Sequence, residues 1–167
     1  VITGETGAGH FGAAIAAGDF NADGRTDIAA SASTYSTNTG RVYIFYNDGN
    51  ITTTAGLPDV AITGEATSDY LGIALTSGDF NADGKTDLAI GAYGYSSFTG
   101  RAYIFNNDGS IPTTAATADT FITGEASSNS FGIALTAGDF NADGRVDLAI
   151  GAYGYSSNTG RVYLMYN

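Results

Sequence analysis

The chain has 167 residues, a formal net charge of −11 and no cysteine. This length suits one domain with a sizeable core, and the negative charge argues against nucleic acid and anionic membranes as partners. The lack of cysteine excludes a disulfide framework and thiol chemistry, and no apolar run approaches the roughly 18 residues that a membrane span requires.

The sequence repeats itself at an interval of sixty residues. The segment Ile-Thr-Gly-Glu at residues 2–5 returns at 62–65 and 122–125. We therefore treat the chain as a single repeat domain with repeats at 1–60, 61–120 and 121–167. Repeats two and three are nearly identical over long stretches, which indicates recent duplication or deliberate engineering.

Each repeat is predicted to contain four strands. In the first repeat these are residues 11–20, 27–32, 41–46 and 60–64, separated by Gly, Asn, Asp and Thr-rich turns. No segment shows a helical period long enough to matter. The prediction is an all-β fold.

The first and second predicted strands are joined by nine residues with the pattern Asp-x-Asn-x-Asp-Gly-x-x-Asp. Oxygen-bearing side chains at positions 1, 3, 5 and 9, with Gly at position 6 for a sharp turn of positive φ, suit a hard cation with about six or seven oxygen ligands. We therefore predict three Ca²⁺ ions per chain. The predicted side-chain ligands are Asp19, Asn21, Asp23 and Asp27, then Asp79, Asn81, Asp83 and Asp87, then Asp139, Asn141, Asp143 and Asp147, joined by the backbone carbonyls of Arg25, Lys85 and Arg145.

The alternative is that Asn-Ala-Asp-Gly forms only a β-turn. Calcium is favoured because every oxygen position recurs in all three copies, whereas positions 7 and 8 vary. The loop is not an EF-hand, because its position 12 is Ala30, Ile90 or Ile150 where that motif requires Glu. Three Asp in each loop account for nine of the 17 acidic residues. Their carboxylates would repel one another without metal, so the metal-free form should be destabilised.

Residue sizes predict how the strands are arranged. The third strand, residues 41–46, is apolar or aromatic at both odd and even positions, so both of its faces should be buried. The first strand is rich in Gly and Ala. A sheet that is thin at one edge and bulky towards the other is a wedge, and wedges placed around an axis form a β-propeller with the small-residue strands inside.

The sequence also resembles a known family. Phe11-Gly12 and its counterparts at 71–72 and 131–132, the acidic loops, and Gly-Ala-Tyr at 91–93 and 151–153 look like FG-GAP repeats. The resemblance implies the calcium-binding propeller of integrin α subunits and many secreted bacterial proteins, with adhesion-like protein recognition and an extracellular location. Repeat one departs from the pattern, with Ser-Ala-Ser at 31–33.

The order of strands suggests self-association. Residues 1–5 read as a fourth strand with no blade before it, and residues 163–166 as a third strand with no fourth. If two chains meet head to tail, each N-terminal strand completes the partner's last blade, giving 3 + 3 = 6 blades. The expectation is a homodimeric six-bladed propeller of four-stranded antiparallel blades. The alternative is a segment of a longer single-chain propeller.

No catalytic constellation recurs in the three repeats. The single histidine, His10, aligns with Tyr70 and Ser130, and no Gly-x-Ser-x-Gly elbow is present. Glu5 and Arg41, which recur in each repeat, are predicted to be structural or to pair locally. The chain is therefore predicted not to be an enzyme.

Ligand binding is predicted on the loops between the second and third strands. Aromatic and polar side chains at Tyr95, Phe98, Tyr155 and Asn158 could stack on a sugar or serve a protein interface. Tyr93 and Tyr153 are expected to pack between blades instead. Three hypotheses stay open: a protein-recognition module, a calcium-dependent lectin, and an engineered scaffold without a natural ligand.

Overall fold

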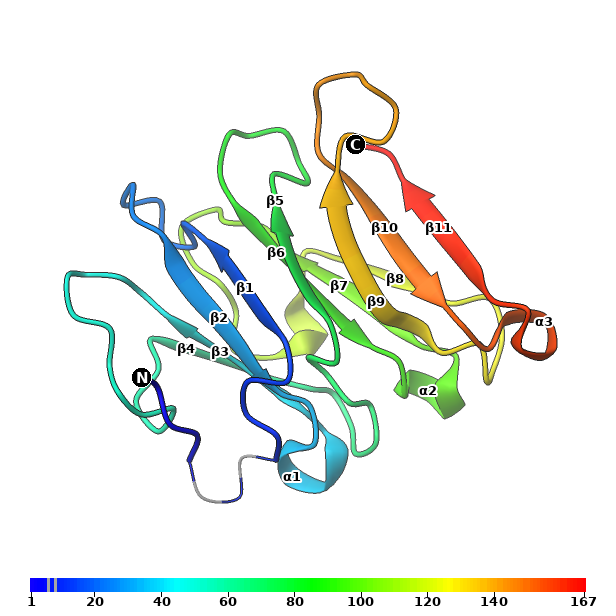
Figure 1. Ribbon diagram of the computed structural model, residues 1–167, viewed down its shortest axis with the longest axis horizontal. Coiled ribbons are helices and arrows are strands. Elements are labelled where there is room, and N and C mark those ends of the chain that lie inside the picture. Colours follow the sequence, from blue (N-terminus) through cyan, green and yellow to red (C-terminus); the bar gives the residue numbers. More distant parts are fainter. Residues whose placement is uncertain (6, 8) are drawn as a thin grey trace.

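The computed structural model describes residues 1–5, 7 and 9–167, and these form three antiparallel sheets placed side by side in chain order (Figure 1). Blade 1 consists of β1 (Ile15–Gly18), β2 (Asp27–Ala32), β3 (Arg41–Phe45) and β4 (Val60–Thr63). Blade 2 consists of β5 (Leu75–Gly78), β6 (Asp87–Ala92), β7 (Arg101–Phe105) and β8 (Thr120–Thr123). Blade 3 has β9 (Phe131–Gly138), β10 (Asp147–Ala152) and β11 (Arg161–Met165). The all-β prediction is confirmed.

Short helical turns interrupt the sheets but add no helical layer. They are α1 (Tyr35–Asn38), α2 (Tyr95–Phe98), α3 (Tyr155–Asn158) and the 3-10 turn η1 (Ala115–Thr117). The sequence analysis did not predict these turns, because four residues are too few to show a helical period.

The predicted strand bounds agree with the structure except at the first strand. The second strand of repeat one is found as predicted, and the third and fourth are each one residue shorter. The first strand was predicted over residues 11–20 but is regular only over Ile15–Gly18. Gly12 has positive φ of 84° and regular pairing with β2 begins only at Ile15, whereas in repeat three, with φ of 85° at Gly132, β9 begins at Phe131 and its pairing with β10 has an irregular register at that end.

The three sheets are arranged as propeller blades with the small-residue strands innermost. β5 contacts β1 on one side and β9 on the other, and these three inner strands consist largely of Ala, Gly, Ser and Thr (Figure 1). In β3 the residues Val42 to Phe45 are all buried, on both faces of the sheet. The wedge prediction is thus confirmed for blades 1 and 2.

Most of the core lies between blades rather than within one. One cluster joins Val42, Ile44 and Ile62 of blade 1 to Leu88 and Ile90 of blade 2. A second cluster joins blade 2 to blade 3. A third lies on the free face of blade 1, where it is covered by Ile2 and Phe11 and by Ile51 and Ala55 of the loop before β4. Each blade therefore depends on a neighbouring blade to bury its faces.

An ion pair in each repeat holds the start of that repeat against its own third strand. Glu65 accepts a hydrogen bond of 2.7 Å from the Tyr103 hydroxyl and pairs with Arg101 at 3.0 Å. The equivalent pairs are Glu5 with Arg41 and Glu125 with Arg161. Burial and the Glu65 hydrogen bond raise the pKa of Tyr103, so the phenol stays protonated as the donor. The hydrogen-bonding role expected of the glutamates and the local pairing expected of the arginines are confirmed.

A buried aspartate before blade 2 gives the protein a predicted pH dependence. Asp69 is 4% exposed and accepts the Ala66 N–H at 2.9 Å. Burial raises the pKa of Asp69 above its usual value and nearby Glu65 adds to this rise, while the Ala66 N–H and Arg101 oppose it. Because the folded-state pKa is above the unfolded value, the folded protein binds the proton more tightly, and this residue lowers stability as pH rises through that range.

We expect Asp69→Asn to raise the melting temperature at pH 7, and the gain to disappear below about pH 3, where the aspartate is protonated in both states. Repeat three already carries Asn129 at this position, also buried. The measurement is a thermal melt of both proteins across pH, with Asp108→Asn in an exposed turn as the control. A gain that is equal at every pH would contradict this account.

Candidate functional site

The three acidic loops lie together at one end of the sheets. Each joins the inner strand of a blade to the second strand, at the end opposite to α1, α2 and α3 (Figure 1). Most loop residues are exposed. The structure therefore presents three similar loops, one per blade, along the same edge.

Each loop is folded by hydrogen bonds from its own backbone to its acidic side chains. The Asp19 carboxylate accepts the N–H groups of Asp23 (3.1 Å) and Gly24 (2.8 Å), and Asp23 accepts that of Arg25 at 2.8 Å. The same three bonds recur in the second and third loops with distances between 2.8 and 3.1 Å. Positions 1 and 5 thus have the same orientation in every copy.

The aspartate at position 9 is buried and has a second role. Asp87 accepts the N–H of Phe80 at 2.8 Å, at the start of the loop, and that of Asn107 at 2.9 Å, just after β7. Asp27 and Asp147 make the equivalent pairs of bonds. Burial raises the pKa of Asp87 and of Asp27, backbone hydrogen bonds oppose this, and the two loop aspartates at positions 1 and 5 raise it further.

The backbone agrees with the prediction at position 6 and shows a further feature at position 4. Gly24, Gly84 and Gly144 have φ of 84°, 83° and 87°, the predicted positive values. Ala22, Ala82 and Ala142 also have positive φ, between 59° and 62°. An alanine in the left-handed region costs about 1–2 kcal/mol. The sequence analysis missed this strain because alanine carries no signal for it.

These loops fit a hard cation by their chemistry. The donors are oxygen atoms only, and an ionised carboxylate has about four lone-pair sites, so accepting one or two N–H groups leaves acceptor capacity. No group of three or more His, Cys, Asp and Glu side chains within residues 1–5, 7 and 9–167 forms a ready metal cluster. The carboxylates bond instead to the loop backbone. The residues that would hold a cation are those at positions 1, 3, 5, 7 and 9 of each loop.

The four residues predicted to bind a ligand have two different environments. The rings of Tyr95 and Tyr155 are covered by the guanidinium groups of Arg101 and Arg161, at 3.7 and 3.6 Å from the ring centroids. Phe98 and Asn158 are exposed. The structure therefore leaves Phe98 and Asn158 available on this surface, while the two tyrosine rings support the arginines of the ion pairs. Ligand binding here stays a prediction.

Tyr93 and Tyr153, which were expected to pack between blades, differ from one another. Tyr93 is half-buried and lies 4.9 Å from Tyr70, ring centroid to ring centroid. Tyr153 is 55% exposed. Tyr93 contacts the rings of Tyr70 and Phe98, whereas repeat three has Ser130 and Asn158 at the equivalent positions.

The turns that carry these residues also hold consecutive repeats together. In α2 the residues Ser96, Ser97 and Phe98 all have positive φ, and the carbonyls of Ser97 and Phe98 bond to the next repeat. Ser97 and Phe98 accept the N–H groups of Ser128 (3.2 Å) and Ser130 (2.7 Å). The α1 turn bonds residues 68 and 70 in the same way. Three successive residues with left-handed φ are unusual, and their residue types do not indicate this conformation. Ligand binding was therefore the only role predicted for these turns.

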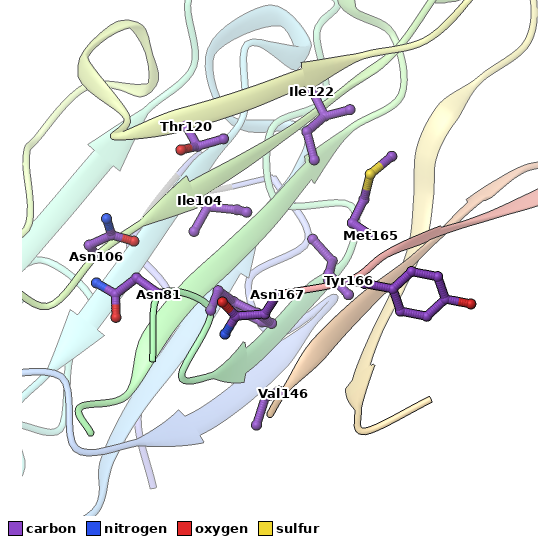
Figure 2. Close-up of a pocket in the computed structure, with 11 residues that line it drawn as sticks. Asn81, Ile104, Asn106, Thr120, Ile122, Val146, Met165, Tyr166 and Asn167 are labelled. Carbon is purple, nitrogen blue, oxygen red and sulfur yellow. The ribbon is translucent and has the colours of Figure 1, made fainter. Parts of the chain in front are cut away.

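A cavity of about 230 Å³ lies between blades 2 and 3, beside the loop of repeat two. Figure 2 shows the amides of Asn81, Asn106 and Asn167 towards one end, and Ile122 and Met165 towards the other. Tyr46, Val60 and Phe105 occupy the equivalent positions between blades 1 and 2 and contribute to the core there. The cavity exists because smaller or more polar residues replace these three, namely Asn106, Thr120 and Met165. This cavity was not predicted from the sequence.

Comparison with known proteins agrees with the repeat pattern. The FG-GAP repeat family model matches residues 11–45, 71–105 and 131–165, more than half of the chain. Integrin alpha-IIb of Mus musculus is 34% identical over 93% of this chain and 16% of its own length. Integrin alpha-PS2 of Drosophila melanogaster is 32% identical over 91% of this chain and 12% of its own length. Phosphatidylinositol-glycan-specific phospholipase D of Bos taurus is 40% identical over 58% of this chain and 13% of its length.

The chain spans less than a fifth of the length of these curated relatives. The part that the structure describes contains no helix of the length and apolarity needed to cross a membrane. Three matched repeats, three loops with one hydrogen-bonding pattern and three blade-like sheets agree with one another. The chain therefore belongs to the FG-GAP repeat family.

Proposed function

We propose that this chain is a calcium-stabilised, non-catalytic recognition module that acts outside the cell. The observation that carries the proposal is the threefold recurrence of an oxygen-only loop with the same internal hydrogen bonds. The similarity to integrin α chains and to a phospholipase D supports recognition through a propeller surface. An extracellular location suits such loops, because modules of this kind can bind calcium at about 10⁻⁴–10⁻³ M.

Calcium should bind in a ratio of three ions per chain and stabilise the fold. At 1 mM Ca²⁺, sites with dissociation constants of about 10⁻⁴–10⁻³ M stabilise by about 0.4–1.4 kcal/mol each, or about 1–4 kcal/mol for three sites. The measurement is a thermal melt with calcium and with EDTA, together with the calcium stoichiometry. Magnesium serves as the control cation, since its preference for near-ideal octahedral geometry suits these loops less well.

Asp83→Ala tests one loop by itself. Asp83 is exposed, so its loss should remove one calcium ion per chain without unfolding blade 2. Lys85→Ala is the matched control, because position 7 would use only its backbone carbonyl, and it should leave the stoichiometry at three. A wild-type stoichiometry for Asp83→Ala would show that this loop holds no calcium.

The cavity between blades 2 and 3 supports a second candidate function, the binding of a small carbohydrate. Its amides could bond to hydroxyl groups while Ile104, Ile122 and Met165 contact the apolar side of a ring. A glycan array probed in calcium separates the two candidates: binding that is lost in Met165→Phe, which fills the cavity, favours the lectin. No glycan binding favours protein recognition or a scaffold without a ligand.

A further inference from the structure

We propose that blade 3 of one chain docks on blade 1 of a second copy, so that two chains close a ring of six blades. The proposal goes beyond calcium binding and recognition and is independent of both. We call the face that a blade turns to the following blade its trailing face, and the opposite face its leading face. Equivalent positions in the three blades differ in burial in the way that this docking requires.

The trailing face of blade 3 is apolar and uncovered. Val42 of β3 is fully buried against blade 2, as is Ala102 of β7 against blade 3, but Val162 of β11 is 67% exposed. Phe20 is 1% exposed and its equivalent Phe140 is 43% exposed. Blade 3 therefore carries apolar side chains at the positions that blade 1 buries against its neighbour, but on blade 3 these side chains are exposed.

The leading face of blade 1 shows the complementary pattern. Leu75 of β5 is 9% exposed under blade 1, whereas the equivalent Ile15 of β1 is 65% exposed. A cavity of about 490 Å³, larger than that between blades 2 and 3, is lined by Ile15, Ile28, Phe11 and Ile2 on this face. Both free faces of the three-blade unit are therefore apolar and have equivalents that are buried inside it.

Hydrogen-bonding groups on the two free faces match in the same way. The Asn107 side chain donates to the Asp19 carbonyl of the preceding blade at 2.9 Å, and Asn167 donates to that of Asp79 at 3.2 Å. The next members of this series are Asn47 on blade 1 and the Asp139 carbonyl on blade 3. The Asn47 side chain has no partner among the described residues. Docking of a second copy would form this third bond.

The edge of blade 3 also fits a strand that the chain itself supplies. β3 pairs with β4 and β7 with β8, in registers that place Val42 opposite Ile62 and Ala102 opposite Ile122. Among the residues that the structure describes, β11 pairs with β10 alone. The equivalent partner for Val162 is Ile2.

The N-terminal segment is already held in the position that this pairing requires. Thr3 donates its N–H to the Thr53 carbonyl at 3.0 Å, as Thr63 does to that of Thr113 at 3.1 Å. Residues 1–3 therefore bond to the loop of repeat one in the same way as the end of β4 bonds to the loop of repeat two. β4 bonds to repeat two along one edge and pairs with β3 along its other edge. The equivalent other edge of residues 1–3 therefore faces the position that a preceding blade would occupy.

Two copies are the number that closes the ring. Propellers typically have four to eight blades, and six is the only multiple of three in that range. The same pair of faces meets twice in the dimer, which leaves no sheet edge or apolar blade face open. The occupant of each free face is therefore a second copy of this chain.

The first test is the mass in solution in the presence of calcium. Light scattering should give twice the chain mass of 17.0 kDa. A variant with Ile2→Cys and Val162→Cys should form a covalent dimer on oxidation and release the monomer on reduction, because the wild type has no cysteine. Each single-cysteine variant is the control and should form no such product. A folded monomer, or a ladder of higher multiples from the double variant, would overturn the proposal.

Glycine substitutions test the geometry of the contact. A Cβ on Gly40 or Gly100 would lie 2.2 or 2.1 Å from a backbone oxygen of the next blade, whereas a Cβ on Gly160 meets nothing closer than 3.6 Å within the chain. Gly160→Ala should therefore act at the interface, raising the dimer dissociation constant at least about a hundredfold, since the ring contains the clash twice.

The matched control is Gly109→Ala, which also has positive φ and has no atom within 4 Å of the added Cβ. It should leave the dimer dissociation constant within about threefold of the wild type, the scatter expected of an exposed turn. Equal effects of the two substitutions would show that backbone strain, and not contact with a second copy, explains the result. The calcium stoichiometry should be measured in the same samples. A monomer that still binds three calcium ions per chain would contradict the dimer but not the calcium sites.

Discussion

Replacing Asp87 by alanine should lower the free energy of unfolding by about 2–4 kcal/mol, even in EDTA. Its two carboxylate oxygens accept the N–H groups of Phe80 and Asn107, at 2.8 and 2.9 Å, and the residue is fully buried. Alanine would leave both donors without a partner, and each orphaned buried donor costs about 1–3 kcal/mol. Relief of the buried charge offsets part of this loss, because burial raises the pKa of Asp87.

Asp87→Asn is the informative control for this prediction. Its amide oxygen can accept one of the two N–H groups while its NH₂ group faces the other, so the loss should be intermediate. Asp83→Ala in EDTA should change the free energy of unfolding by less than about 0.5 kcal/mol, since Asp83 is exposed. The measurement is urea unfolding of the four proteins with EDTA. Similar stabilities for Asp83→Ala and Asp87→Ala would show that the buried hydrogen bonds contribute little.

The class of fold and the arrangement of the sheets could be predicted because each weak sequence pattern recurs in all three repeats. A single stretch such as residues 41–46 is only a short apolar run, but three copies at one interval, each after a Gly-Ala-rich segment, indicate wedge-shaped sheets. The predicted start of the first strand was wrong for repeat one, where regular pairing begins only at Ile15, after a bend with φ of 84° at Gly12. A glycine adopts positive or negative φ with little difference in energy, so the sequence does not fix that bend.

The three acidic loops lie where turns were predicted, and the assignment of their side chains to calcium stays a prediction. Spacing alone assigns Asp27 to the metal. The structure shows that Asp27 also accepts the Phe20 and Asn47 N–H groups, at 2.8 and 2.7 Å. A signal for this role was present, because Asp27 opens an apolar strand whereas Asp19 and Asp23 lie among turn residues. An aspartate at such a boundary is a candidate for capping backbone groups as well as for binding a cation.

The tyrosines of the one-turn helices illustrate a limit of pattern reasoning. Tyr95 was predicted to face a ligand, yet its ring lies under Arg101. The contact depends on three consecutive residues with positive φ, and Ser, Ser and Phe give no indication of that conformation. The spacing of Tyr and Arg, six residues apart in all three repeats, was the available signal. A recurring aromatic–arginine pair supports a cation–π contact as readily as a binding surface.

Gly100→Ala should destabilise the chain by about 2–5 kcal/mol, as the sum of a backbone cost and a packing cost. Gly100 has φ of 82°, where a Cβ costs about 1–2 kcal/mol. The added Cβ would also lie 2.1 Å from the Phe131 carbonyl oxygen and 2.5 Å from its nitrogen. These are backbone atoms of the parallel bridge that joins the end of α2 to blade 3, so no side-chain rotation can relieve the clash.

Gly109→Ala separates the two costs, because Gly109 has φ of 117° with no atom within 4 Å of the added Cβ. It should show only the cost of the left-handed backbone, about 1–2 kcal/mol. Urea unfolding measures both variants, and hydrogen exchange should show the loss in Gly100→Ala concentrated at Phe131 and Gly124, whose N–H groups bond to the α2 turn and to Gly100. Equal losses for the two variants would mean that blades 2 and 3 can separate at this point without cost. Because the same bridge recurs between blades 1 and 2, that result would also weaken the view that close backbone contact at these glycines fixes the spacing of the blades.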